Sequence, residues 1–298
     1  MRFFSKAALL AVFLGSLGAG PAFATPPIWE PSFGGVLAAL TGQDDDTTSV
    51  SLSFNFPFLG TNYTTIYVGT NGCIQLGSLG SDGDIDYDHW SYFEEFIDDA
   101  APEICPMNTD LDLSTTGTIH FSDLGDHAVF TWNGVGTYQD ETALSTFQVQ
   151  IWNTGKIVFG YNGILNGPGE NPLVSLDQGI VTGITLSNNV DPGPMDLSQA
   201  ASATGPTAYE RWCYDTANSC GTGGADTGMP GPTNLAFDLD QQNVIFDPIV
   251  GGRGFNVSGT AVQKPVPTLS QWSLLILGGL LALTAALGSR KRVIQINA

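Results

Sequence analysis

The chain has 298 residues, of which 9 are Lys or Arg and 29 are Asp or Glu, so its formal net charge is −20 at pH 7. A protein that binds nucleic acid needs basic side chains to neutralise phosphates, and this composition excludes that class. The 37 Gly and 17 Pro residues argue against a helical protein, while 42% hydrophobic residues are enough for a buried core.

Residues 1–24 have the pattern of a secretory signal peptide. A positively charged start precedes an apolar run from residue 7 to 17, and Ala22 and Ala24 lie at the expected cleavage site. We expect cleavage to leave Thr25 as the new amino terminus. An uncleaved membrane anchor is the alternative, although the apolar run is short for one.

The body of the chain alternates polar and apolar residues with a period of two, which predicts β-strands. In residues 49–56 every second side chain is apolar. Residues 146–152 and 156–161 form the clearest pair, because their apolar faces match across an Asn-Thr-Gly turn. Asn71-Gly72 separates two further strands, and Asn-Gly favours the positive φ angles of a tight hairpin. We predict an all-β fold with an antiparallel β-sandwich or jelly-roll-like body.

A series of fragments between residues 33 and 186 resembles the nidogen-like (NIDO) extracellular domain. The order and spacing of these fragments carry the resemblance, which implies a nidogen-like β domain over residues 33–190 with an adhesive or structural role. The fragments are Asp44-Asp45-Asp46, residues 54–61, residues 66–72, Thr109-Asp110-Leu111-Asp112, and residues 118–119, 147–149 and 155–157.

Residues 191–264 form a Gly- and Pro-rich C-terminal extension. Runs of these residue types predict loops or a linker. Within the extension, residues 208–213 and 244–246 are candidate strands. They belong either to the edges of the same body or to a small accessory subdomain.

Residues 265–298 resemble the IPTL-CTERM sorting signal of Gram-negative bacteria. The motif consists of Val266, Pro267, Thr268, Leu269, Ser270 and Trp272. An uncharged stretch over 272–288 predicts a short transmembrane helix, and the basic residues 290–292 should remain in the cytoplasm.

This second resemblance implies that the chain is anchored transiently in the inner membrane and recognised by an exosortase-type enzyme. The enzyme would remove the helix and deliver the body to the cell surface, the outer membrane or the extracellular matrix. A permanent single-span anchor is the alternative, because the geometry of the tail does not distinguish the two.

Four cysteines in an exported chain predict two disulfides, and three connectivities are open. We favour Cys213 with Cys220, which enclose a short loop, and Cys73 with Cys105. The second pair would join the strand after the Asn-Gly turn to the segment before Asp110. Buried reduced thiols are the alternative.

An alternating run of aspartates is a candidate Ca²⁺ site, because closely spaced carboxylates are the hard oxygen ligands that Ca²⁺ prefers. The candidate ligands are Asp82, Asp84, Asp86, Asp88 and Glu95. His89 stands where an EF-hand-like loop needs Gly, so we prefer a solvated acidic loop as the interpretation. The pairs Asp110 with Asp112 and Asp238 with Asp240 are weaker candidates.

The sequence contains no nucleophile elbow, zinc-protease pair or phosphate-binding loop. We therefore expect a non-enzymatic surface or matrix protein with an adhesion or structural role, and no cofactor other than the candidate Ca²⁺. The alternatives are a carbohydrate-binding module, in which Trp90 would stack on a sugar, and a secreted glycan hydrolase that uses paired carboxylates. The expected partners are the sorting enzyme, the membrane before processing, and an extracellular polysaccharide or matrix protein.

Overall fold

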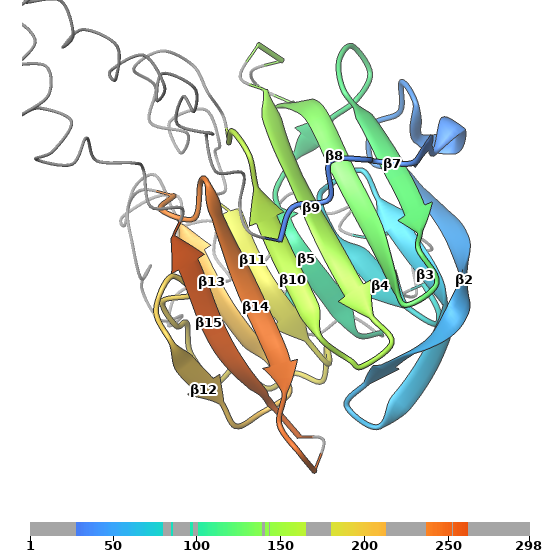
Figure 1. The fold of residues 1–298 in the computed structure, drawn as a ribbon. Helices are drawn as coiled ribbons and strands as arrows, with labels where there is room; N and C mark the ends of the chain where they lie inside the picture. The colour runs from blue at the N-terminus through green and yellow to red at the C-terminus, as the bar shows by residue number, and fades with distance from the viewer. Residues whose placement is uncertain are drawn as a thin grey trace, which may run out of the picture. The chain divides into compact units, whose positions relative to one another are not determined.

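The alternating segments of the sequence form antiparallel strands in two sheets (Figure 1). Apart from one short 3₁₀ helix, η1 (Ala38–Leu40), and a helical turn at 96–97, the regular structure of the described residues is β. The prediction of an all-β antiparallel fold is confirmed. This computed structural model describes residues 28–79, 85, 96–97, 101–138, 141–142, 144–164, 180–212, 237–251 and 253–261.

Sheet A has nine strands in the spatial order β1-β7-β8-β9-β10-β14-β15-β12, and β6 pairs with β8 beside this path. Its strands are β1 (Gly35–Val36), β6 (Leu111–Asp112), β7 (Thr118–Asp123), β8 (His127–Thr137), β9 (Ser145–Trp152), β10 (Ile157–Tyr161), β12 (Ala201–Ala203), β14 (Gln242–Pro248) and β15 (Phe255–Ala261). Strands β7 to β10 follow one another in the chain and in space, so short turns suffice to connect them.

Sheet B has six strands in the order β13-β11-β5-β4-β3-β2. They are β2 (Thr47–Phe58), β3 (Thr61–Gly69), β4 (Ile74–Leu76), β5 (Glu103–Asn108), β11 (Ile180–Thr185) and β13 (Ala208–Trp212). Strand β2 forms one edge of this sheet. There the Ser53 backbone N–H and hydroxyl both donate to the Asp123 carboxylate of β7, at 2.6 and 2.8 Å, and so tie the two sheets together.

The observed strand registers match the predicted alternation. Phe159 of β10 lies opposite Val149 of β9, and Tyr161 lies opposite Phe147. These side chains are fully buried, as a shared apolar face requires. In β2 the inward residues are buried or half-buried, and the intervening serines are exposed.

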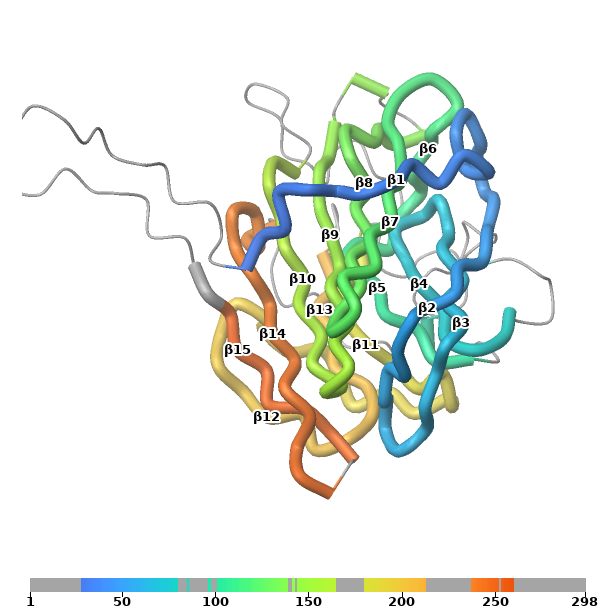
Figure 2. Tube along the Cα trace, turned by 45° about the vertical axis from the view of Figure 1, so that its right-hand side comes forward, coloured from blue at the N-terminus to red at the C-terminus, as the bar shows by residue number. Residues whose placement is uncertain are grey.

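The two sheets lie face to face in the tube view (Figure 2). The buried hydrophobic side chains between them form one core. Hydrogen bonds also join the sheets inside the core: Trp132 Nε1 of sheet A donates to the Gly69 carbonyl of sheet B at 3.2 Å, and the Tyr161 hydroxyl donates to the Pro106 carbonyl at 2.7 Å. Buried polar tips need such partners, and these bonds fix the indole and phenol between the layers.

The C-terminal strands belong to the same body as the earlier ones. β14 lies inside sheet A between β10 and β15, and β13 pairs with β11 at the edge of sheet B. The body therefore continues past the predicted boundary at residue 190. Of the two predicted alternatives, these strands belong to the same body and do not form an accessory subdomain. Local patterns do not reveal this arrangement, because β10 and β14 are far apart in the chain.

Among the described residues, no helix has the length and apolar character needed to cross a membrane. The predicted signal peptide, 1–24, and the predicted transmembrane segment, 272–288, lie outside the part of the chain that the structure describes.

Candidate functional site

Three fragments that carry the first resemblance meet at one place in the fold. They are residues 44–46 before β2, residues 70–72 after β3, and residues 109–112 around β6. The Thr70 N–H donates to the Asp46 carbonyl at 3.0 Å, and the Thr109 N–H donates to the Asn71 carbonyl at 3.3 Å. Segments that are distant in sequence thus form one junction, held together by backbone hydrogen bonds.

Asn71 connects all three segments through its side chain. Its Nδ2 donates to Asp45 Oδ1 at 2.9 Å, and its Oδ1 accepts the Leu111 N–H at 3.0 Å. The side chain is fully buried, so neither bond is exchanged freely with water. The predicted positive φ of Asn71 is wrong, because only Gly72 of the Asn-Gly pair has positive φ, at 84°. A Cβ on Gly72 would lie 1.9 Å from the Met107 carbonyl oxygen, so this close approach requires glycine.

The carboxylates of Asp44, Asp45 and Asp110 come together at this junction, which we call the acidic junction. Their nearest oxygens all lie within 4.8 Å of one another. Asp44 is exposed and the other two are half-buried. Carboxylates this close repel one another, and a divalent cation, a proton or water can relieve the repulsion. Asp112, the predicted companion of Asp110, does not join them and instead accepts the Ser114 N–H at 2.6 Å.

A second group of carboxylates consists of Asp196, Glu210 and Asp238, whose nearest oxygens also lie within 4.8 Å of one another. Burial raises the pKa of Asp238, and the charge of Asp196 raises it further. Glu210 is fully buried and accepts the Leu197 N–H at 2.7 Å. Asp240, the predicted companion of Asp238, is not part of the group, because its carboxylate accepts two backbone N–H groups at 163–164.

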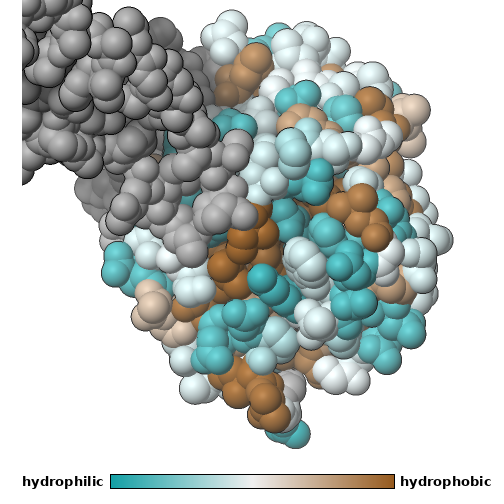
Figure 3. Space-filling model, in the orientation of Figure 1, coloured by the Kyte–Doolittle hydropathy of each residue, from teal (hydrophilic) through white to brown (hydrophobic). Residues whose placement is uncertain are grey.

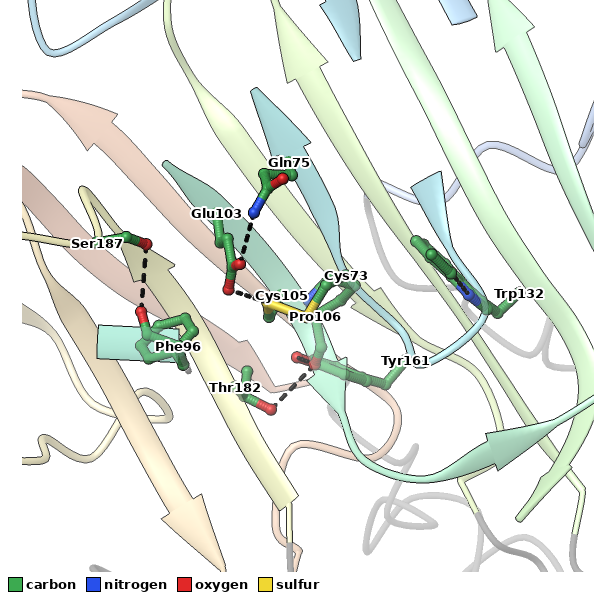
Figure 4. Close-up of a disulfide and its surroundings, with 11 residues drawn as sticks. Cys73, Gln75, Phe96, Glu103, Cys105, Pro106, Trp132, Tyr161, Thr182 and Ser187 are labelled. Atoms are coloured by element: carbon green, nitrogen blue, oxygen red, sulfur yellow. Dashed lines mark hydrogen bonds between the residues drawn. A yellow bond between two sulfur atoms is a disulfide. The ribbon is translucent and has the colours of Figure 1, made fainter. Parts of the chain in front are cut away.

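The disulfide joins Cys73, just before β4, to Cys105 in β5 (Figure 4). The register of the two strands places the cysteines opposite each other, with a Cα–Cα distance of 4.2 Å. Cys73 with Cys105 is one of the two pairings predicted from the sequence. Beside it, Gln75 Nε2 donates to Glu103 Oε1 at 3.0 Å, and both side chains are fully buried.

The disulfide belongs to a small apolar cluster that is separate from the main core. Val181 and Tyr209 of sheet B contribute to it. Ile85, Phe96 and Ile97 also pack there, and they are the described residues of the segment that contains the predicted Ca²⁺ ligands. The disulfide thus cross-links the part of sheet B on which these anchoring residues rest.

The remaining predicted site residues lie outside the described part of the chain. They are the sorting motif Val266, Pro267, Thr268, Leu269, Ser270 and Trp272, the disulfide candidates Cys213 and Cys220, the Ca²⁺ candidates Asp82, Asp84, Asp86, Asp88 and Glu95, and Trp90. Sequence reasoning missed the acidic junction, although the order of the three resembling fragments was a signal that they share one region.

Comparison with known proteins identifies the family. A family model described as NIDO related matches residues 24–211, which is more than half of the chain. The chain belongs to the NIDO-related family. All three segments of the acidic junction lie within this match, and so does the Cys73–Cys105 disulfide. No solved structure matches the chain.

An IPTL-CTERM motif matches residues 264–292. Both resemblances are therefore confirmed. The motif implies processing by an exosortase-type enzyme, and together with the NIDO-related domain it indicates an exported, C-terminally sorted protein of the cell surface.

Proposed function

We propose that this NIDO-related protein is a non-enzymatic adhesion or structural protein of the bacterial surface or extracellular matrix. The observation that carries the proposal is the presence of a NIDO-related body and a surface-sorting motif in one chain. The folded body and the sorting signal are close in the chain, because β15 ends at Ala261 and the motif match begins at residue 264.

The surface of the body suits contact with other molecules and does not favour aggregation of the protein itself. In the orientation of Figure 1, polar side chains predominate on the visible face, and hydrophobic ones form small separate groups (Figure 3). The large hydrophobic side chains that are exposed among the described residues are Val36, Leu124, Tyr138, Leu144, Val190 and Val250. A net charge of −20 keeps copies apart in solution, while salt or divalent cations weaken that repulsion.

The position of Glu210 supports a non-catalytic role for the second carboxylate group. Glu210 lies on the face of β13 that it shares with Ala208 and Trp212, and both of these side chains belong to the core between the sheets. A retaining glycosidase places two carboxyls about 5–5.5 Å apart on either side of a bound sugar. A carboxylate inside the core is out of reach of a polysaccharide chain.

We further propose that sorting removes residues 274–298 and leaves the body at the surface. Intact-mass analysis of native protein tests this part directly. A mature species without those residues is the expected result, and a species that retains them contradicts it in favour of a permanent anchor.

Cell attachment tests the proposed function. Cells that produce the full chain are compared with cells that produce Pro267→Ala/Thr268→Ala, in which the sorting motif is altered and the body is not. We expect the variant to lose surface protein and attachment to matrix or abiotic surfaces together. Unchanged attachment without surface protein contradicts an adhesive role, and turnover of a polysaccharide by purified protein contradicts a non-enzymatic one.

A further inference from the structure

The outer face of sheet A is crossed by residues 28–33, which we call the strap. Figures 1 and 2 show it as the dark blue segment that passes over β10, β9 and β8 before it reaches β1. The strap does not pair as a strand there. Side chains of the sheet hold it instead.

Three amide side chains bind the backbone of the strap. Gln148 Nε2 donates to the Glu30 carbonyl at 3.2 Å, and its Oε1 accepts the Glu30 N–H at 2.9 Å. Gln150 Nε2 donates to the Ile28 carbonyl at 3.0 Å. Asn243 bonds to the same residue, with Nδ2 to the carbonyl at 3.3 Å and Oδ1 from the N–H at 3.4 Å. The three amides are almost fully buried and bind alternate residues, as a neighbouring strand would.

A single aromatic side chain occupies the centre of this groove. Gly160 of β10 lies between Gln148 and Asn243 in the strand registers. A Cβ on Gly160 would lie 3.1 Å from the Trp29 ring and 3.1 Å from Asn243 Nδ2, so the missing side chain makes room for the indole. Phe33 packs edge-on against Trp29, with ring centroids 6.1 Å apart. The groove therefore recognises an extended backbone with one large aromatic residue.

We propose that this groove accepts the strap of a second copy of the chain, so that two copies exchange straps. Every groove residue lies in β9, β10 or β14, and the strap precedes the first strand, so the same contacts form between two chains without threading. Predicted signal cleavage leaves only residues 25–27 ahead of the strap. Gly34, with φ of 79°, is the residue between the strap and β1 and serves as the hinge.

Exchange gives a weak contact between copies, and a weak contact suits an adhesive surface. The strap also closes on its own groove, and this intramolecular closure competes with exchange because it offers the same contacts at high effective concentration. Many copies on two facing cell surfaces make up for the weakness of each single contact, because their binding is multivalent. Glu30 is the single charged residue of the strap, and the groove amides are neutral, so we expect added salt to favour exchange by screening the overall net charge. This inference rests on the proposed function and names its partner.

Mixed-cell aggregation tests the exchange with the full chain. Trp29→Ala leaves the groove intact and removes the aromatic residue that fills it. Gly160→Val leaves the strap intact and fills the groove, with a residue that suits a β-strand. Cells that carry either variant alone should lose at least about tenfold in aggregation, as expected when a multivalent contact loses its bond. Tyr138→Ala, at a side chain that is 61% exposed and is not among the strap's contacts, is the matched control and should aggregate like the wild type.

The decisive sample is a mixture of the two variants. The strap of Gly160→Val cells fits the groove of Trp29→Ala cells, so mixed populations should aggregate with each other although neither aggregates alone. A mixture that stays dispersed, with both variants at wild-type surface levels, overturns the proposal, and so does a wild type that does not aggregate.

If either variant fails to reach the surface, a synthetic peptide of residues 25–33 replaces it. The peptide should disperse wild-type aggregates, its Trp29→Ala form should not, and equal effects of the two peptides overturn the proposal. Attachment to foreign surfaces, measured on the same cells, reports separately on the proposed function.

Discussion

Removal of the Cys73–Cys105 disulfide should cost several kcal/mol of folding free energy. The bond closes a loop with a sequence separation of 32 residues. In the chain-entropy treatment, a loop of this length removes about 12 cal/mol/K from the unfolded chain, which amounts to about 3.7 kcal/mol at 25 °C. For a body of this size, such a loss corresponds to a fall in Tm of about 7–15 °C.

The assay is urea unfolding of Cys73→Ala/Cys105→Ala beside the wild type under oxidising conditions. The denaturant slope m should rise, because the unfolded chain without the cross-link exposes more surface. Val181→Ala is the matched control: this side chain lies in the same apolar cluster, and its truncation should cost about 1–2 kcal/mol without a change in m. A double variant that loses less than about 1 kcal/mol with unchanged m would refute the reasoning from loop entropy.

Three further predictions concern polar groups. Asn71→Ala should lower the free energy of unfolding by about 2–4 kcal/mol in urea titrations, because it leaves a buried N–H without its acceptor; a loss below about 0.5 kcal/mol contradicts the bridging role. Burial raises the pKa of Asp123, but hydrogen bonds from Ser53 and Gly125 outweigh it and lower the pKa below its ordinary value of 3.8. The ionised Asp123 carboxylate should therefore stabilise the folded protein above pH 3.8, and this stabilisation should be lost as the pH falls below that value. In Asp123→Asn, Tm should fall less steeply with acid than in the wild type. Identical profiles of Tm against pH would contradict a stabilising role for the Ser53–Asp123 hydrogen bonds. At the acidic junction, Asp110→Asn should raise Tm in the presence of chelator by relieving repulsion, as differential scanning fluorimetry would show, and a lower Tm would mean that the carboxylates do not repel one another.

Local patterns were sufficient to predict strands whose partners are close in the chain. The register of β9 and β10 follows from strict alternation and a short turn, so the facing of Phe147 and Tyr161 was readable in advance. The position of β14 was not, because its pairing with β10 joins residues that are far apart, such as Phe159 and Val244. Pairing of this kind depends on the rest of the sheet being in place.

The candidate sites show the same division. Asn71 was recognised as a turn residue, but its structural role comes from a side chain that reaches Asp45 and the Leu111 N–H in other segments. Gln148 and Gln150 look like solvent-facing residues in an alternating strand. They are buried because the strap covers them, and the strap contains no pattern of regular structure from which its path could be inferred.

The central place of β10 has a consequence for the timing of export. Its two neighbours in sheet A are β9, which precedes it, and β14, which begins at Gln242. If the chain leaves the membrane amino end first, one edge of β10 stays unpaired until β14 has also crossed the membrane. β14 ends at Pro248, and the match to the sorting motif begins 16 residues later, at residue 264, so the open side of β10 is covered shortly before the motif arrives. Completion of folding and readiness for processing are thereby brought together by the order of strands alone.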